Sequence, residues 1–273
     1  MNRPLRSGST AATGALLGLG AAVSFGLSAP LAKLLLGEIT PVLLAGLLYL
    51  GAAAGLWLAH FVRPKSGEAR LQRSDLPRLA AIVLAGGVVG PVALLLGLGR
   101  VSAFVGSLCL NLEAPLTMLL AVLVFGEHLG RRAAAGGLCI LAGAVALGLG
   151  LGSESGAGRG DTPGALLIAA ACLCWALDNN LTQQLSVRDP FAIVRVKTLV
   201  AGATNTLLGL SLASGAAPSG GFVAGAFMLG SVSYGLSVVL DTYALRQVGA
   251  AREAAYFATA PFIGALAALL LFG

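Results

Sequence analysis

Residues 102–132, SAFVGSLCLNLEAPLTMLLAVLVFGEHLGRR, form an apolar run that ends at Arg131 and Arg132. The run is long enough to cross a bilayer as a helix, because about 20 residues rising about 1.5 Å each span the hydrocarbon core. One charge interrupts it, since Glu113 lies near its middle, two residues before Pro115. A carboxylate at this depth costs a few kcal/mol and must face protein or water, so Glu113 is a candidate functional residue.

The composition of the whole chain indicates a membrane protein. Charged residues make up 10% of the 273 residues and apolar residues 57%, whereas about a quarter of a soluble domain is charged. We therefore predict an all-α polytopic membrane protein with nine membrane-spanning helices. Six of them lie near residues 12–36, 40–61, 76–98, 101–126, 132–151 and 163–186. The seventh begins near Pro190 and ends at a break at 214–220, and the last two lie near 222–245 and 254–273.

The formal net charge of +6 is explained by the ends of the predicted spans. No soluble domain carries a basic face with interleaved aromatic residues, which excludes a nucleic-acid partner. If the N-terminus is cytoplasmic, most arginines at span ends fall on the cytoplasmic side and only Arg100 and Arg159 fall outside. This is the positive-inside pattern, so we expect a multi-pass protein of the cell membrane, in contact with lipid, with a cytoplasmic N-terminus.

The four cysteines all lie inside predicted spans. Cys172 and Cys174 are two residues apart on a helix and point to different faces, which argues against a disulfide or a metal site. We interpret the cysteines as small packing residues and expect neither a metal nor a cofactor.

Two halves of the chain resemble each other. Gly14-Ala15-Leu16-Leu17 recurs as Gly164-Ala165-Leu166-Leu167, and Arg100 with Ala114-Pro115 recurs at the same spacing as Arg246 with Ala260-Pro261. We divide the chain into a first repeat at 1–151, a linker at 152–163 and a second repeat at 164–273. If each repeat has five spans, the second is inverted relative to the first. Inverted repeats place a binding site at the midplane between the halves, as in secondary transporters.

This count leaves the second repeat one helix short. The first half continues past its Ala-Pro helix into a fifth span, whereas the second half stops at Phe272-Gly273. A tenth helix is therefore expected to be missing, either by truncation, which the apolar end without an interfacial anchor favours, or in a natural nine-span protein. The fifth span is rich in Gly and Ala and carries no charge, which favours a packing surface or a homodimer interface.

The sixth and seventh predicted spans carry most of the polar groups. Trp175, Asp178 and Asn179 lie on the sixth span, and Lys197 lies on the seventh. Asp178 and Lys197 are each about eight residues from the cytoplasmic end, a depth of about 12 Å at helical rise. They are therefore expected to be able to pair across adjacent helices.

The eighth predicted span has one polar stripe. Ser233, Ser237 and Asp241 follow each other at four-residue steps, with Tyr234 beside them. Two interpretations are equally supported: the stripe lines a substrate pathway, or the serines bond to their own helix backbone and Asp241 lies at the interface.

The two acids deep in the membrane are not duplicated between the halves. In the paired registers Glu113 meets Thr259 and Asp178 meets Ser28. Unmatched acids favour a specialised site over a requirement of the fold, with a structural salt bridge as the alternative. A desolvated carboxyl such as Glu113 would suit proton binding and release during transport.

Together these residues resemble a known family. Glu113-Ala114-Pro115 with Phe125-Gly126-Glu127, Trp175 with Asp178-Asn179-Asn180, and Ala260-Pro261 are similar to the EamA-type permeases of the drug/metabolite transporter superfamily. The resemblance implies ten spans with both termini cytoplasmic, and a function as exporter or exchanger of small metabolites. In this sequence the ninth predicted helix is the last one, which departs from the ten spans of the family.

Our main hypothesis is a secondary active transporter that moves an amino acid-like zwitterion or an organic cation by alternating access, with proton coupling as one energy source. The chain has no nucleotide-binding motif that would support ATP drive. A membrane scaffold or regulatory subunit is the alternative, and an intramembrane enzyme is the least supported, because H-E-x-x-H and G-x-S-x-G motifs are missing from the sequence. The predicted substrate or ion pathway consists of Glu113, Asp178, Lys197, Trp175, Asn179, Ser233, Ser237 and Tyr234.

Overall fold

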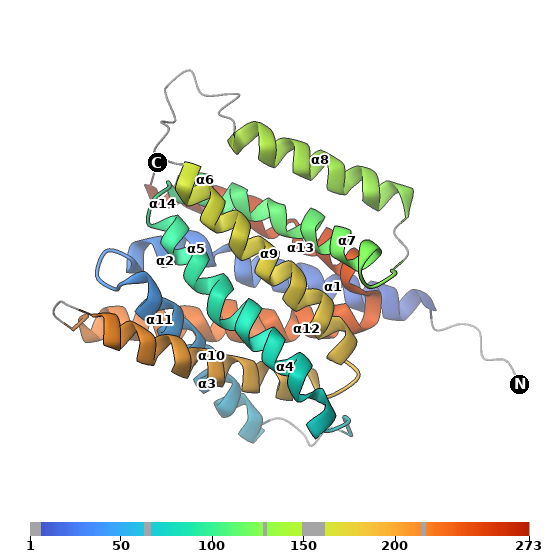
Figure 1. Ribbon diagram of the computed structural model, residues 1–273, viewed down its shortest axis with the longest axis horizontal. Helices are drawn as coiled ribbons and strands as arrows, with labels where there is room; N and C mark the ends of the chain where they lie inside the picture. Colours follow the sequence, from blue (N-terminus) through green and yellow to red (C-terminus); the bar gives the residue numbers. More distant parts are fainter. Residues whose placement is uncertain (1–6, 63–66, 128–129, 149–161, 214–216, 273) are drawn as a thin grey trace, which may run out of the picture.

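The computed structural model describes the chain except residues 1–6, 63–66, 128–129, 149–161, 214–216 and 273. Within this part the protein is a bundle of helices and contains no strand (Figure 1). Eight stretches are long and apolar enough to cross a membrane, which confirms the helical membrane class. They are Ala12–Leu35, Pro41–Phe61, Arg73–Leu98, Ala103–Leu123, Thr162–Leu185, Pro190–Leu212, Gly220–Val248 and Ala250–Phe272.

The fifth predicted span corresponds to α8 (Arg131–Gly148). This helix is formed, but it is not one of the eight stretches, so the count of nine stays a prediction. Figure 1 shows α8 along the outside of the bundle, next to α7 (Glu113–Leu123). Of the predicted linker, residues 152–161 lie outside the described part, and residues 162 and 163 belong instead to the first turn of α9 (Thr162–Leu185).

The first span is not one continuous helix. It consists of α1 (Ser7–Gly26) and α2 (Ser28–Leu35), with Leu27 between them. Pro30 explains the break, because proline has no N–H to donate and its ring clashes with the carbonyl four residues earlier, that of Gly26. The predicted span is thus correct in extent but not continuous.

Two later spans contain a widened turn. After α3 (Pro41–Val62), the third span runs through α4 (Leu76–Ile82), the π-helical segment η2 (Val83–Val89) and α5 (Gly90–Leu98). The same device appears between α11 (Gly220–Leu229) and α12 (Ser237–Val248), joined by the π-helical segment η4 (Gly230–Leu236). Both segments contain glycines, and π-helical turns are frequent at functional sites.

Two further spans are interrupted just before an alanine–proline pair. α6 (Ala103–Cys109) passes through a short 3₁₀ turn, η3 (Leu110–Leu112), into α7. Similarly, α13 (Ala250–Phe257) is separated from α14 (Ala260–Phe272) by Ala258 and Thr259. In each case proline stands in the first turn of the second helix, where its missing N–H is not needed.

Small residues let α3 pack closely against α10 (Pro190–Leu212). A Cβ added at Gly202 would lie 2.7 Å from the backbone nitrogen of Leu50, and one at Gly209 would lie 2.5 Å from the Cα of Leu43. A Cβ at Gly46 would meet the backbone of Thr206. Backbones in such direct contact are typical of helix pairs in membranes.

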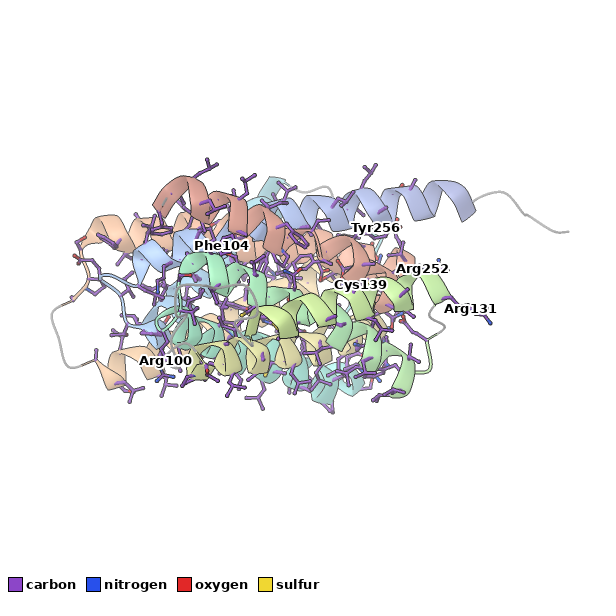
Figure 2. All side chains as sticks on the ribbon, turned by 90° about the horizontal axis from the view of Figure 1, so that it is seen from above. Arg100, Phe104, Arg131, Cys139, Arg252 and Tyr256 are labelled. Atoms are coloured by element: carbon purple, nitrogen blue, oxygen red, sulfur yellow. The ribbon has the colours of Figure 1, made fainter. Side chains whose placement is uncertain are left out.

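The charged ends of the bundle can be distinguished in the view from above. Figure 2 shows Arg131 and Arg252 near one end of the bundle and Arg100 near the other. The outer faces between these ends carry exposed apolar side chains such as Leu16, Phe61 and Leu270. A bundle with an apolar belt between polar ends is what a lipid environment requires.

Candidate functional site

Two adjoining cavities lie in the interior of the bundle. The cavity that we call the Glu253 cavity has a volume of about 410 Å³ and the one that we call the Lys197 cavity about 430 Å³, counting all space between the atoms. Both cavities are lined by Phe25, Glu113, Asn179 and Phe257, which therefore form the wall between them.

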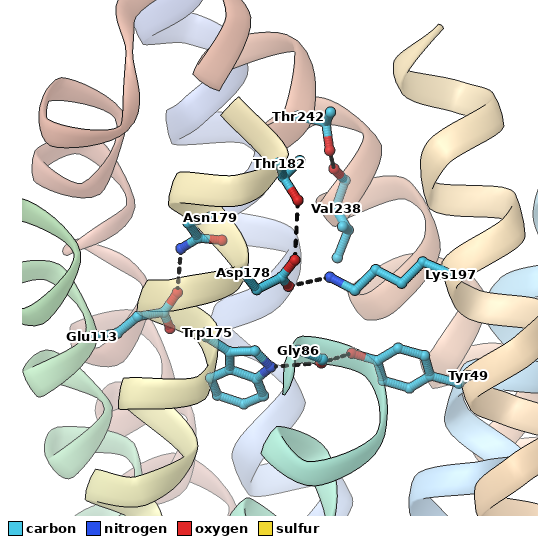
Figure 3. A network of polar contacts seen from close by, with 10 residues as sticks. All are labelled: Tyr49, Gly86, Glu113, Trp175, Asp178, Asn179, Thr182, Lys197, Val238 and Thr242. Atoms are coloured by element: carbon cyan, nitrogen blue, oxygen red, sulfur yellow. Dashed lines mark hydrogen bonds and ion pairs between the residues drawn. The ribbon is translucent and has the colours of Figure 1, made fainter. Parts of the chain in front are cut away.

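Glu113 lies at this wall, where α7 begins. Its side chain is buried, with 8% of the residue exposed, and its Oε1 accepts a hydrogen bond of 2.9 Å from Nδ2 of Asn179 on α9 (Figure 3). The carboxyl thus faces protein and cavity, as a mid-membrane acid must. The structure brings Glu113 and Asn179, both predicted from the sequence, into direct contact.

Asp178 and Lys197 form a buried ion pair between α9 and α10. The other carboxylate oxygen of Asp178, Oδ1, accepts a hydrogen bond of 3.0 Å from Thr182, one turn further along α9. Asp178 is 2% exposed and Lys197 5% exposed, and both line the Lys197 cavity. The predicted pairing across adjacent helices is therefore present, and each charge keeps the other satisfied in a low-dielectric interior.

Trp175 anchors the base of this network. Its indole Nε1 donates a hydrogen bond of 3.0 Å to the carbonyl of Gly86, and the hydroxyl of Tyr49 donates one of 2.8 Å to the same carbonyl (Figure 3). Gly86 lies in η2, where the wide turn leaves this carbonyl accessible to side chains. The Trp175 ring also meets Phe25 edge to face, with ring centroids 5.7 Å apart, a favourable aromatic geometry.

The residues predicted on the eighth span divide between two roles. Tyr234 and Ser237 line the Lys197 cavity, and Ser233 does not line either interior cavity. The hydroxyls of Ser233 and Ser237 donate hydrogen bonds of 2.8 and 3.0 Å to the carbonyls of Ser24 and Ala21 on α1. The stripe therefore bonds to the neighbouring helix α1, and not to its own backbone.

Sequence reasoning missed Glu253 and left Asp241 open. Glu253 on α13 is fully buried and lines the Glu253 cavity, and Asp241 on α12 is 8% exposed and lines the Lys197 cavity. Glu253 follows the exposed Arg252 and lies only three residues after the start of α13. From the sequence it was therefore interpreted as part of the charged end of a span. The available signal was helical periodicity, because Glu253 shares a face with Ala250 and Phe257 and not with Arg252.

The lining of the two cavities combines both signs of charge with aromatic rings. Four carboxyl groups and the ammonium of Lys197 contact this space, together with Phe25, Trp175 and Tyr234. An ammonium group attracts carboxylates, and carboxyl groups and aromatic faces attract cations. Among the described residues, no group of three or more His, Cys, Asp or Glu side chains is arranged to hold a metal ion. The arrangement suits a small charged organic molecule.

Comparison with known proteins gives three findings. A model of the EamA-like transporter family matches residues 12–149. A curated protein of Methanothermobacter thermautotrophicus, named "Uncharacterized transporter", is 31% identical over 263 residues, which cover 92% of this chain and 77% of that protein. A solved structure described only as the crystal structure of a protein superimposes with a TM-score of 0.74 at 21% identity, covering 94% of this chain and 89% of the other, and shows that the fold is shared.

Proposed function

The chain belongs to the EamA-like transporter family, and from this premise we propose that it is a secondary active transporter for a small metabolite. Membrane transport follows from the family and from the eight apolar helices. The finer statement is our proposal: the protein moves an amino acid-like zwitterion or an organic cation by alternating access, as an exporter or exchanger, and protons drive it. No chemical reaction is part of the proposal.

The observation that carries the proposal is the buried pair of charges beside a further acid. Asp178, Lys197 and Glu113 line one cavity, and they come from three helices of both halves of the chain. A zwitterion could exchange partners with the ion pair, its carboxylate taking Lys197 and its ammonium taking Asp178 or Glu113. Intramembrane ionisable groups that face a cavity mark substrate and ion pathways.

The arrangement of the halves supports alternating access. π-helical segments occur at η2 and η4, and breaks occur before Ala114-Pro115 and before Ala260-Pro261, at matching places in the two halves. We propose that the halves are inverted repeats with the site between them. Because the charged residues that line both cavities are buried, a metabolite can enter only after helices around the site have moved.

The proposed orientation places the N-terminus in the cytoplasm and the protein in the cell membrane. Arg131 and Arg252 lie near the end of the bundle opposite Arg100 (Figure 2). The positive-inside rule assigns the arginine-rich end to the cytoplasm. Cysteine accessibility at Glu38→Cys and Arg252→Cys, probed with a membrane-impermeant thiol reagent on intact cells in a variant without its native cysteines, tests this orientation.

Reconstitution in liposomes tests the function directly. The purified protein is screened with labelled amino acids, polyamines and lipophilic cations, with and without a pH gradient, alongside Glu113→Gln and Asp178→Asn. We expect uptake of one class of solute that both variants lose. The matched control is Glu38→Gln, an exposed acid outside the cavities, which should transport like the unmodified protein.

Two results would overturn the proposal. Folded protein that moves none of these solutes would favour a scaffold or regulatory subunit. Unchanged transport in both cavity variants would remove Glu113 and Asp178 from the pathway while leaving transport itself intact.

A further inference from the structure

Glu253 is a buried acid without the partners that an ionised carboxylate needs. It is fully buried, and neither of its carboxyl oxygens receives a hydrogen bond from an N–H or O–H group of the described residues. Its side chain lines the Glu253 cavity. An ionised carboxylate in such a place would lose its hydration without compensation, at a cost of several kcal/mol.

The polar neighbour of Glu253 is a second acid. The carboxyl of Asp241 lies within hydrogen-bonding reach of Glu253. The two helices α12 and α13 meet at Gly249, whose φ of +80° allows the tight turn that brings both acids to the same side. Ionised carboxylates only accept hydrogen bonds, so two of them can bond to each other only when one carries a proton.

Among the described residues, the cation that acts on Asp241 is Lys197. The titratable groups that face it are Glu113 from α7, Asp178 from α9 and Lys197 from α10. Lys197 already forms its ion pair with Asp178. From α1 the pair meets Gly18, where an added Cβ would lie 3.7 Å from Oε1 of Glu253, so this helix closes the site without a charge.

We propose that Asp241 and Glu253 form a binding site for a single proton that the two carboxyl groups share. The site adjoins the Asp178–Lys197 pair, because Asp241 lines the same Lys197 cavity, and it extends away from that pair, because Glu253 lines the Glu253 cavity instead. A proton on the pair removes one negative charge from the interior. Release of that proton leaves two adjacent carboxylates, which favours either separation of α12 from α13 or entry of a cationic group.

Coupling of this proton to transport rests on the proposed function. Opening of the cavity would let water reach the pair, and binding of a cationic group near Asp241 would expel the proton. In such a cycle one proton would move against each substrate cation. The proton site itself does not depend on transport, so the two parts can be tested separately.

The first test is infrared spectroscopy of the purified protein in detergent at neutral pH. A protonated carboxyl group absorbs apart from a carboxylate, and Glu113→Gln identifies the contribution of that acid. We expect Asp241→Asn and Glu253→Gln to shift or remove the same protonated-carboxyl band, and the double variant to remove it. If either single substitution left that band unchanged, or if the two removed different bands, the shared proton would be disproved.

The second test uses liposomes and the labelled solute that the unmodified protein moves. We expect Asp241→Asn and Glu253→Gln to lose the acceleration by a pH gradient, and Glu38→Gln to keep it. Gradient-driven uptake equal to that of the unmodified protein in both pair variants would overturn the coupling. If the unmodified protein moved no solute, the proposed function would fail while the infrared result would still decide the proton site. Should one variant not fold, the other decides, because both acids hold the same proton.

Discussion

Two helices of this protein begin at an alanine–proline pair in the middle of a span, and their surroundings are opposite. At the start of α7, Glu113 is buried and accepts a hydrogen bond from Asn179 on another helix. At the start of α14, the corresponding residue Thr259 is exposed, and its hydroxyl donates to the carbonyl of Tyr256 on its own chain segment, 2.9 Å away. Both breaks thus lie next to a proline, but only at the first break does a polar side chain, that of Glu113, face the interior.

This difference favours the interpretation that residues matched between the two halves build the scaffold, and that unmatched residues such as Glu113 build the candidate site. If this is right, substitutions around the α7 break should have large effects and substitutions at the α14 break small ones. The following variants test the comparison in order of decreasing expected effect.

The largest effect is expected for Lys197→Met. The substitution leaves the buried Asp178 without its counter-charge beside the α7 break, which typically costs about 3–5 kcal/mol. The free energy of unfolding, measured by SDS titration, should fall by this order. The double variant with Asp178→Asn removes both charges and should recover much of the stability but no transport. Equal stability of Lys197→Met and the unmodified protein would mean that the ion pair is not formed.

The next effect is expected for Gly86→Ala. A Cβ at this position would overlap the carboxylate of Asp178, and overpacking of a tight interior typically costs about 1–3 kcal/mol. Gly221→Ala is the matched control, because a Cβ there meets no atom within 4 Å, and alanine in a helix is favoured by about 0.5–1 kcal/mol. Thermal unfolding in detergent distinguishes them; a Gly86→Ala protein as stable as the control would contradict the described packing.

Glu113→Ala should cost a similar or slightly smaller amount. It leaves the half-buried amide of Asn179 without its acceptor, a loss of about 1–3 kcal/mol. Glu113→Gln keeps an acceptor oxygen and should fold normally, so the two variants separate stability from transport. Both should reduce transport to the level of empty liposomes. Transport by Glu113→Gln at the unmodified rate would show that the acidity of this residue is not needed.

A smaller effect is expected at the other end of α7. Glu127 accepts hydrogen bonds of 3.2 and 3.1 Å from the backbone nitrogens of Ala250 and Ala251, and so caps α13. Its replacement by alanine should cost about 1 kcal/mol, as for other helix caps. Glu127→Gln retains an acceptor and should lose less. If hydrogen exchange of the first turn of α13 did not increase in Glu127→Ala, the cap would be dispensable.

The smallest effect is expected for Thr259→Val at the α14 break. An exposed hydroxyl bonded to its own chain segment contributes little, and the free energy of unfolding should change by less than about 0.5 kcal/mol. Transport should be unchanged as well. A loss comparable with that of Glu113→Ala would show that the two breaks are equivalent after all.

Much of the fold could be predicted from the sequence, because each apolar run marks a span by its own length and composition. The pairing of Asp178 with Lys197 could also be predicted, since both lie at one depth on consecutive spans. Hydrogen-bond partners that lie on helices far apart in the sequence could not be predicted, because they depend on how those helices pack. The two hydrogen bonds to the Gly86 carbonyl depend on the widened turn η2, which the sequence did not predict.

The burial of Glu253, an acid of the second half, could not be predicted from the sequence either. Glu253 lies near a span end by sequence, and it is buried because α1 and α7 pack against α13. The depth of a residue within its span can be counted from the sequence. Which helix packs over that residue cannot be predicted in this way.

The close contact of α3 with α10 has a consequence for how the molecule can move. These helices come from different halves of the chain, yet their backbones touch at Gly46, Gly202 and Gly209. Sliding or parting them would open a gap along bare backbone, so we expect the two helices to move together in the proposed transport cycle. A moving unit that contains both α3 and α10 is therefore expected to combine helices from the two halves of the chain.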